Sequence, residues 1–124
     1  MQIVIPGKYQ DSAMVKASSP ALWGELLKAG VEIHRYQPTM YHCKVLIVDD
    51  AFTSVGSTNF DNRSFQLNDE VNLNVFDEQF AAQQARIFNA DLERSERYTY
   101  DEWVRRPWYQ QAVNWLVRPF RREF

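Results

Sequence analysis

The stretch that decides the fold is HCKVLIVDDAFTSVGSTN, residues 42–59. An aliphatic run is followed by two adjacent aspartates and then by a short return segment, a pattern typical of a β-hairpin. We expect a strand over residues 40–49, a tight turn at Asp50-Ala51 and a second strand over residues 52–55. This hairpin determines where the polar residues on either side of it can lie.

The polar residues around the hairpin are of types that suit phosphoryl transfer without a metal. His42 and Lys44 are two positions apart, so a regular strand points them to one face, whereas Asp49 has the opposite parity and is expected to anchor the hairpin. A histidine can be a nucleophile or a general acid, and a lysine can hold phosphate oxygens. Ser57 and Asn59 follow the return strand, where they can donate hydrogen bonds to an anion.

Three further positions bear on the same chemistry. Glu70 begins a later strand, and a carboxylate there can orient the imidazole of His42 through Nδ1 and leave Nε2 free to react. Gly56 permits a close approach of backbone after the return strand. Arg63 lies in the loop that follows, where it either contacts phosphate or a headgroup, or is a solvated residue that braces the loop. A His-x-Lys pair alone usually marks a surface strand. The prediction of a catalytic site therefore depends on the combined spacing of His42, Lys44, Asp49 and residues 56–59.

Outside the hairpin, strand and helix signals alternate along the chain. The expected elements are a strand at residues 3–5, a helix at 21–29 opened by Pro20 and stopped by Gly30, a strand at 31–36, a strand at 70–76 and a helix at 78–95 capped by Asp77. This order predicts an α/β fold with a mixed β-sheet flanked by helices.

The bulk composition is that of one globular domain. The chain has 124 residues, of which 45% are hydrophobic and 24% charged, enough for a single core. Its formal net charge of −2 gives no electrostatic reason to expect nucleic acid. The aliphatic run from Val45 to Val48 is far short of the roughly 20 residues of a membrane-spanning helix. The single cysteine, Cys43, excludes an internal disulfide.

The C-terminal region differs from the rest of the chain. We divide the sequence into a catalytic domain, residues 1–97, and an amphipathic helical tail rich in tryptophan and arginine, residues 98–124. Aromatic and basic residues on one helix suit a bilayer interface that contains anionic lipid. The alternative is a helix that packs its tryptophans on the domain and leaves its arginines in solvent. The sequence leaves both interpretations open.

The spacing of residues 42–59 matches in full the HKD motif of the phospholipase D superfamily, His-x-Lys-x4-Asp-x6-Gly-Ser-x-Asn. The run from Gly56 to Leu73 resembles the bacterial cardiolipin synthase branch, and the resemblance extends over roughly residues 3–92. It implies a phospholipase D-like half-domain and a two-step transfer that needs neither metal nor other cofactor. One motif histidine forms a phosphohistidine while another protonates the leaving group. In the synthases, a second phosphatidylglycerol is the acceptor, which gives cardiolipin and glycerol.

The resemblance also implies roles for individual residues. Carried over by position, the catalytic residues are His42, Lys44 and Asp49, with His42 as the nucleophile or acid/base and Asp49 expected to act structurally. The residues that bind the substrate phosphate are Lys44, Ser57 and Asn59, and Glu70 orients a histidine. In two-motif enzymes the C-terminal motif usually supplies the acid/base, and this is the role expected of His42.

Only one such motif is present, because His34 is followed by Arg35-Tyr36 and has no lysine two positions on. The chain is therefore expected to be the C-terminal half of a longer enzyme of the bacterial cytoplasmic membrane, to which this part is peripheral. Its partners would be phosphatidylglycerol, the membrane surface and a second HKD half-domain in the same longer chain. The alternatives are a homodimeric single-motif phosphodiesterase or nuclease, and a non-catalytic remnant that docks on a membrane or a partner.

Overall fold

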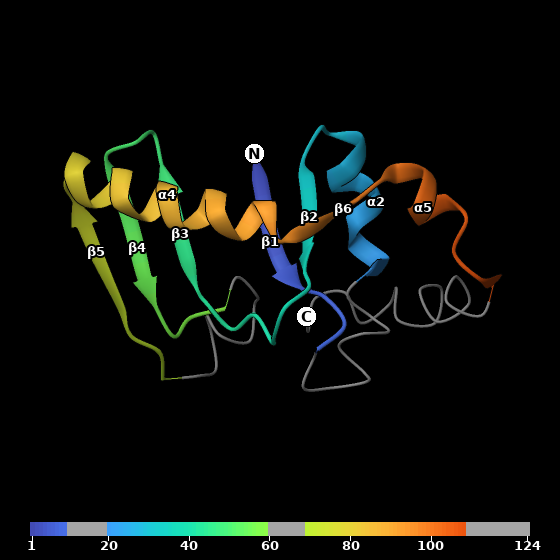
Figure 1. The fold of residues 1–124 in the computed structure, drawn as a ribbon, viewed down its shortest axis with the longest axis horizontal. Helices are drawn as coiled ribbons and strands as arrows, with labels where there is room; N and C mark the ends of the chain where they lie inside the picture. The colour runs from blue at the N-terminus through green and yellow to red at the C-terminus, as the bar shows by residue number, and fades with distance from the viewer. Residues whose placement is uncertain (10–19, 60–68, 109–124) are drawn as a thin grey trace. The chain divides into compact units, whose positions relative to one another are not determined.

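The computed structural model describes residues 1–9, 20–59 and 69–108, and these residues form two compact units. The described part of the first unit lies in residues 1–41 and 92–108, and that of the second in residues 42–91. Each unit contains a three-stranded sheet. The predicted α/β class, with small sheets flanked by helices, is confirmed (Figure 1).

The sheet of the first unit is mixed. Strand β1, Gln2–Pro6, runs parallel to β2, Glu32–Tyr36, and β2 runs antiparallel to β6, Ser95–Tyr98. The order is β1-β2-β6. Strands β1 and β2 agree with the strands predicted from the sequence, whereas β6 was not predicted, because the preceding helix was expected to continue to residue 95 and the tail to begin at residue 98. That extension is wrong, since the helix ends at Glu93 and the chain then joins the edge of β2.

Helix α2, Pro20–Lys28, ends as the sequence predicts. Gly30 has a φ of 82° and donates its N–H to the Leu27 carbonyl at 3.1 Å, and the Val31 N–H reaches the Leu26 carbonyl at 3.0 Å. This pair of bonds is the Schellman motif, which satisfies the last carbonyls of a helix and favours glycine at the left-handed position. The predicted stop at Gly30 is therefore confirmed.

The core of the first unit is aromatic. Ile33 on β2 is 2% exposed, and its partner across the sheet, Tyr98, packs edge-on against Trp23 with ring centroids 5.2 Å apart. Trp103 lies against Gly24 so closely that a Cβ at position 24 would overlap its ring. These contacts pack helix α2 against helix α5, Tyr100–Val104. Thr99 caps α5 reciprocally with a glutamate three residues on, by the capping-box geometry.

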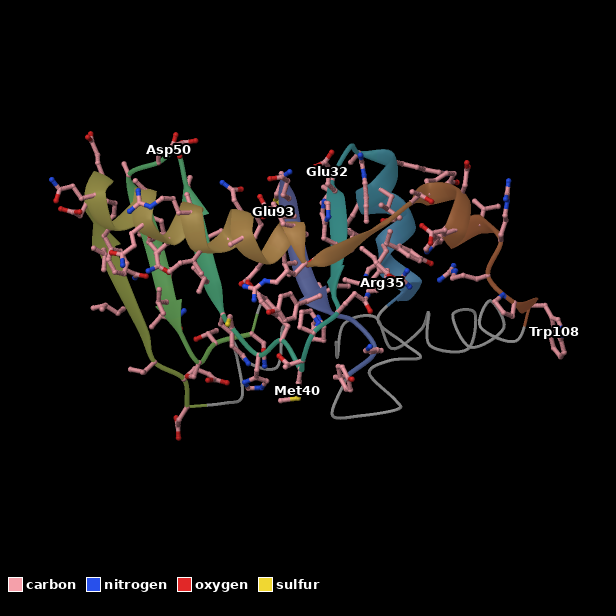
Figure 2. The ribbon with its side chains drawn as sticks, viewed as in Figure 1. Glu32, Arg35, Met40, Asp50, Glu93 and Trp108 are labelled. Carbon is pink, nitrogen blue, oxygen red and sulfur yellow. The ribbon has the colours of Figure 1, made fainter. Side chains whose placement is uncertain are left out.

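The described start of the predicted tail packs into the first unit. Arg106 is buried, lies 4.3 Å from the Trp103 ring centroid and donates from Nε to the Trp103 carbonyl at 2.7 Å. Trp108, by contrast, is 79% exposed (Figure 2). Residues 109–124 of the predicted amphipathic helix lie outside the described part of the chain. Among the helices that are described, none combines the length and the apolar character needed to cross a membrane.

The sheet of the second unit is antiparallel, with strands β3, Val45–Val48, β4, Phe52–Gly56, and β5, Asn72–Phe76 in the order β3-β4-β5 (Figure 1). The predicted hairpin and the predicted following strand are confirmed. The first strand is shorter than predicted, because residues 40–44 lie outside it.

The hairpin turn also differs from the prediction by one residue. Asp49 and Asp50 have φ values of 50° and 55°, and the Ala51 N–H donates to the Val48 carbonyl at 3.3 Å. Positive φ at two successive central residues is the requirement of a type I′ turn, which matches the twist of a hairpin. The central pair is thus Asp49-Asp50 rather than Asp50-Ala51 (Asp50 is labelled in Figure 2), because aspartate tolerates the left-handed region better than most residues.

Helix α4, Glu78–Glu93, follows β5 and begins where the sequence predicts. The carboxylate of Asp77 accepts the N–H of Phe80 at 2.7 Å, and the Asp77 carbonyl accepts the N–H of Ala81 at 2.9 Å. An aspartate in this position satisfies one of the free N–H groups of the first turn and also interacts favourably with the helix dipole. The predicted N-cap is confirmed.

Candidate active site

His42 and Lys44 lie together just before strand β3. The Lys44 Nζ is 2.9 Å from both ring nitrogens of His42 and 3.0 Å from the His42 carbonyl oxygen. The expected pairing of the two side chains is therefore present, although it does not arise from alternation along a strand, since β3 begins only at Val45. The Lys44 ammonium group can only donate, so the ring nitrogen of His42 to which it hydrogen-bonds is the acceptor.

The loop that carries the other motif residues is tied to Lys44 through the backbone. The Gly56 N–H donates to the Lys44 carbonyl at 3.2 Å, which continues the pairing of β3 and β4 beyond the regular ladder. On its other side Gly56 pairs with Asn72 of β5. A Cβ at position 56 would overlap the Val71 carbonyl oxygen and the Asn72 Oδ1. The predicted close approach at Gly56 is confirmed, and only glycine leaves room for it.

Beyond Gly56 the loop is held by a second set of hydrogen bonds. The Ser57 N–H donates to the Val71 carbonyl at 3.0 Å, and the Val71 N–H donates to the Ser57 Oγ at 3.1 Å. The N–H of the buried Thr58 donates to the Asn72 Oδ1 at 3.3 Å. Ser57 and Asn59 are exposed on either side of Thr58. The Ser57 hydroxyl thus accepts from the Val71 N–H and also donates to the Val71 carbonyl oxygen at 3.5 Å, so its proton reaches a bound anion only by rotating away from that oxygen.

Asp49 is not brought to this site. It occupies the hairpin turn, exposed, at the far end of β3 from Lys44. The intervening extended chain is roughly 16 Å long at about 3.3 Å per residue. Asp49 was expected to lie away from His42 because of its opposite strand parity, and in the structure it is a central residue of the hairpin turn with positive φ.

Two other predicted residues have a less defined place. Glu70 is half-buried, two residues before β5 begins, and is the neighbour of Val71 in the loop attachment. Its predicted role in orienting His42 stays a prediction. Arg63 lies outside the described residues. Within the ranges that the structure describes, no cluster of three histidine, cysteine or acidic side chains could hold a metal ion.

Sequence reasoning missed the contribution of Val71 and Asn72. Neither belongs to the motif, yet both supply the acceptors that hold the Ser57 and Thr58 amides. The sequence does show alternating apolar and polar residues over 70–76, which predicts a strand. This alternation does not identify which residues of that strand pair with the motif. Only the register, in which Asn72 stands opposite Gly56, identifies them.

The imidazole of His42 beside the ammonium group of Lys44, next to a tight loop with exposed hydroxyl and amide groups, is a candidate site for phosphoryl transfer in an α/β domain. A family model described as "Cardiolipin synthase, PLD-like domain" matches residues 1–92, and the chain belongs to this family. The resemblance to the phospholipase D superfamily that the motif indicated is thereby confirmed.

Several curated relatives that match most of this chain are named cardiolipin synthases. The minor cardiolipin synthase ClsB of Bacillus subtilis is 36% identical over 118 residues, which cover 95% of this chain and 29% of that protein. The major cardiolipin synthase ClsA of the same organism is 38% identical, covering 96% and 25%. Cardiolipin synthase 1 of Staphylococcus epidermidis is 43% identical, also covering 96% and 25%. The chain therefore spans about a quarter of the length of these relatives.

Two solved structures share the fold. The phosphatidylserine synthase of Haemophilus influenzae Rd KW20 superposes with a TM-score of 0.68 at 20% identity, over 96% of this chain and 33% of that one. The phospholipase D family member Nuc of Salmonella typhimurium superposes with a TM-score of 0.61 at 17% identity, over 79% and 63%. At these identities the likeness supports the fold alone.

Proposed function

We propose that this chain is one half of a phospholipase D-type phosphatidyltransferase that makes cardiolipin from phosphatidylglycerol. The observation that carries the proposal is the contact between Lys44 and His42, held beside the Gly56–Asn59 loop by the bond from the Gly56 N–H to the Lys44 carbonyl. Membership of the cardiolipin synthase family over residues 1–92 supports the substrate class. The substrate is a phospholipid, so the reaction is placed at the bacterial cytoplasmic membrane, to which this part is peripheral.

The transfer proceeds in two steps that use two histidines. In the first, an imidazole nitrogen attacks the phosphorus of phosphatidylglycerol, a P–N bond forms and the P–O bond to glycerol breaks. The departing oxygen takes a proton from the second histidine. In the second step a hydroxyl of another phosphatidylglycerol gives its proton to that second histidine and attacks the phosphorus of the phosphohistidine, so that a P–O bond forms, the P–N bond breaks and cardiolipin leaves the regenerated imidazole. We assign the acid/base role to His42.

The contact between Lys44 and His42 suits this role. When His42 is protonated, the ring can no longer accept a hydrogen bond from Lys44, so the ammonium group is released to a phosphate oxygen. Binding of the anion and charging of the acid thus favour each other. Ser57 and Asn59 are the further donors to the phosphate, because both are exposed on the loop next to Lys44.

The second histidine comes from another half-domain, which we place in the same longer chain because the relatives are roughly three to four times the length of this one. Pairing of two copies of the chain is the rival arrangement. The oligomeric state and the phosphodiesterase activity of the 124-residue chain by itself distinguish these two arrangements. A dimer that hydrolyses bis(p-nitrophenyl) phosphate would mean that two copies of His42 build one site, whereas an inactive chain supports the two-half enzyme.

The main test is cardiolipin and glycerol release by the intact protein from phosphatidylglycerol vesicles. His42→Gln is expected to reduce turnover by at least about a thousandfold, from loss of an essential proton donor, while His34→Gln, the other histidine of the chain, retains it. A substrate with a p-nitrophenol leaving group needs little protonation. It should restore formation of the phosphohistidine in His42→Gln if His42 is the acid, but not if it is the nucleophile. Normal turnover by His42→Gln with phosphatidylglycerol would overturn the assignment.

A further inference from the structure

The side chain of Asn72 lies at the junction between strand β5 and the phosphate-site loop, which is defined here as residues 56–59. In the β4–β5 register Asn72 stands opposite Gly56, the last residue of β4. Its Oδ1 occupies the space into which a Cβ at position 56 would extend. The carboxamide therefore uses the room that the missing side chain of Gly56 provides.

The same oxygen holds the middle of the loop. Asn72 Oδ1 accepts the N–H of Thr58 at 3.3 Å, and Thr58 is only 9% exposed. The preceding amide, that of Ser57, is satisfied by the Val71 carbonyl at 3.0 Å. Backbone bonding to this side of the sheet continues past Gly56 through the Ser57 N–H, and the side chain of Asn72 then supplies the acceptor for the following amide, that of Thr58. Loss of that acceptor leaves a part-buried donor to be satisfied by rearrangement or by water.

Thr58 lies between the two exposed residues that are proposed to bind phosphate, Ser57 and Asn59. Fixing the Thr58 amide therefore fixes the direction of the backbone on both sides of it. The other end of the loop is fixed by the bond from the Gly56 N–H to the Lys44 carbonyl. The loop is thus attached to Lys44 through Gly56, to Val71 through Ser57 and to Asn72 through Thr58.

We infer that Asn72 is a positioning residue: through its bond to the Thr58 N–H it holds Ser57 and Asn59 in the geometry that binds the substrate phosphate. Asn72 is proposed to act through the loop and not on the reacting atoms themselves. The inference rests on the proposed function for the identity of the anion, but the loop attachment exists independently of it. It predicts that loss of the Asn72 oxygen weakens anion binding while the sheet remains formed.

The experiment compares three variants of the intact protein. Asn72→Ala removes the acceptor. Asn72→Asp keeps an oxygen at the same place but adds a negative charge. Asn74→Ala is the matched control, because Asn74 is also exposed on β5, two residues further on, and pairs with Ser54 rather than with the loop. Hydrogen exchange of the Thr58 amide is followed by mass spectrometry of overlapping peptides, with and without inorganic phosphate, and KM and kcat are measured with phosphatidylglycerol.

Asn72→Ala is expected to accelerate exchange at Thr58 by about threefold to tenfold, the range that corresponds to one net hydrogen bond. Protection of the loop by inorganic phosphate should weaken by a similar factor, and KM should rise while kcat changes less, because an interaction made in both ground and transition states is lost. Asn72→Asp should keep Thr58 protected yet still bind phosphate more weakly, an effect that added salt reduces. Asn74→Ala should match the wild type in each measurement.

Several outcomes would overturn the inference. One is exchange at Thr58 in Asn72→Ala that equals that of Asn74→Ala, and another is faster exchange with unchanged phosphate protection. If Asn72→Ala does not fold, Asn72→Asp decides: loss of Thr58 protection in that variant counts against the inference. A wild-type protein that binds phosphate at this loop in an Asn72-dependent manner but makes no cardiolipin would instead refute the proposed function and leave the positioning role standing.

Discussion

Replacement of Gly56 by alanine should perturb the protein far more than the size of one methyl group suggests. The backbone of β4 passes β5 so closely at this position that the new Cβ would overlap the Val71 carbonyl oxygen and the Asn72 Oδ1, and would lie 2.7 Å from the Asn72 Cα. The asparagine side chain can rotate away. The Val71 carbonyl cannot move without losing the N–H of Ser57, which it accepts at 3.0 Å.

The expected cost follows from these contacts. Insertion of a methyl group into a filled space costs roughly 1–3 kcal/mol, and loss of one backbone hydrogen bond adds about 1 kcal/mol. We therefore expect Gly56→Ala to lower the free energy of unfolding by roughly 2–4 kcal/mol. The displaced strand also carries the loop away from Lys44, so phosphatidyl transfer should be lost together with the stability.

Gly30→Ala is the control variant, because glycine is needed at position 30 for its backbone conformation and not for lack of space. Nothing lies within 4 Å of a Cβ at Gly30, and the cost arises only from its φ of 82°. The left-handed conformation costs an alanine about 1–2 kcal/mol, and activity should be retained because α2 carries no residue of the site. Urea unfolding followed by circular dichroism gives both stabilities, and the transfer assay gives the activities. A Gly56→Ala protein with wild-type stability, or one that is destabilised but fully active, would refute the reasoning.

Asp49 and the surface carboxylates offer two further tests. Asp49→Gly should preserve folding and activity, since glycine accepts the φ of 50°. Asp49→Val should lower the urea midpoint of unfolding. A folded but inactive Asp49→Gly protein would argue that the Asp49 side chain takes a direct part in the chemistry. The pKa of Glu32 is lowered from 4.5 by a hydrogen bond from Gln2 and then by Arg97, and that of Glu102 by the N–H of Thr99. A carboxylate whose pKa is lower in the folded than in the unfolded state stabilises the protein above its unfolded-state pKa, and this stability is lost as the pH falls through its folded-state pKa. The urea midpoint should therefore decrease as the pH is lowered from about 5 to about 3. Glu32→Gln should make this decrease less steep.

Local signals account for the parts of the fold that the sequence predicted well. Gly30 and Asp77 act on the helix turn next to them, and both were assigned correctly because their effect depends on a few neighbouring residues. The hairpin was predicted for the same reason, from an aliphatic run beside Asp49-Asp50. The turn was misplaced by one residue, because either adjacent residue pair suits a tight turn and only the strand register selects one of them.

Elements that depend on distant partners were predicted poorly or not at all. Strand β6 contains few apolar residues, and its place is set by pairing with β2, which lies far from it in the chain. Strand β3 begins only at Val45, so His42 and Lys44 meet through the contact of their side chains rather than through strand alternation.

The sequence alone determined the family of this protein, because the types and spacing of His42, Lys44, Ser57 and Asn59 match one motif in full. What the tertiary structure decided is how those groups are held. Asn72 meets the loop only because β5 pairs with β4 in one register, with Asn72 opposite Gly56. A one-residue slip would turn its side chain to the other face of the sheet. Register depends on the packing of the whole sheet, and no short stretch of sequence contains it.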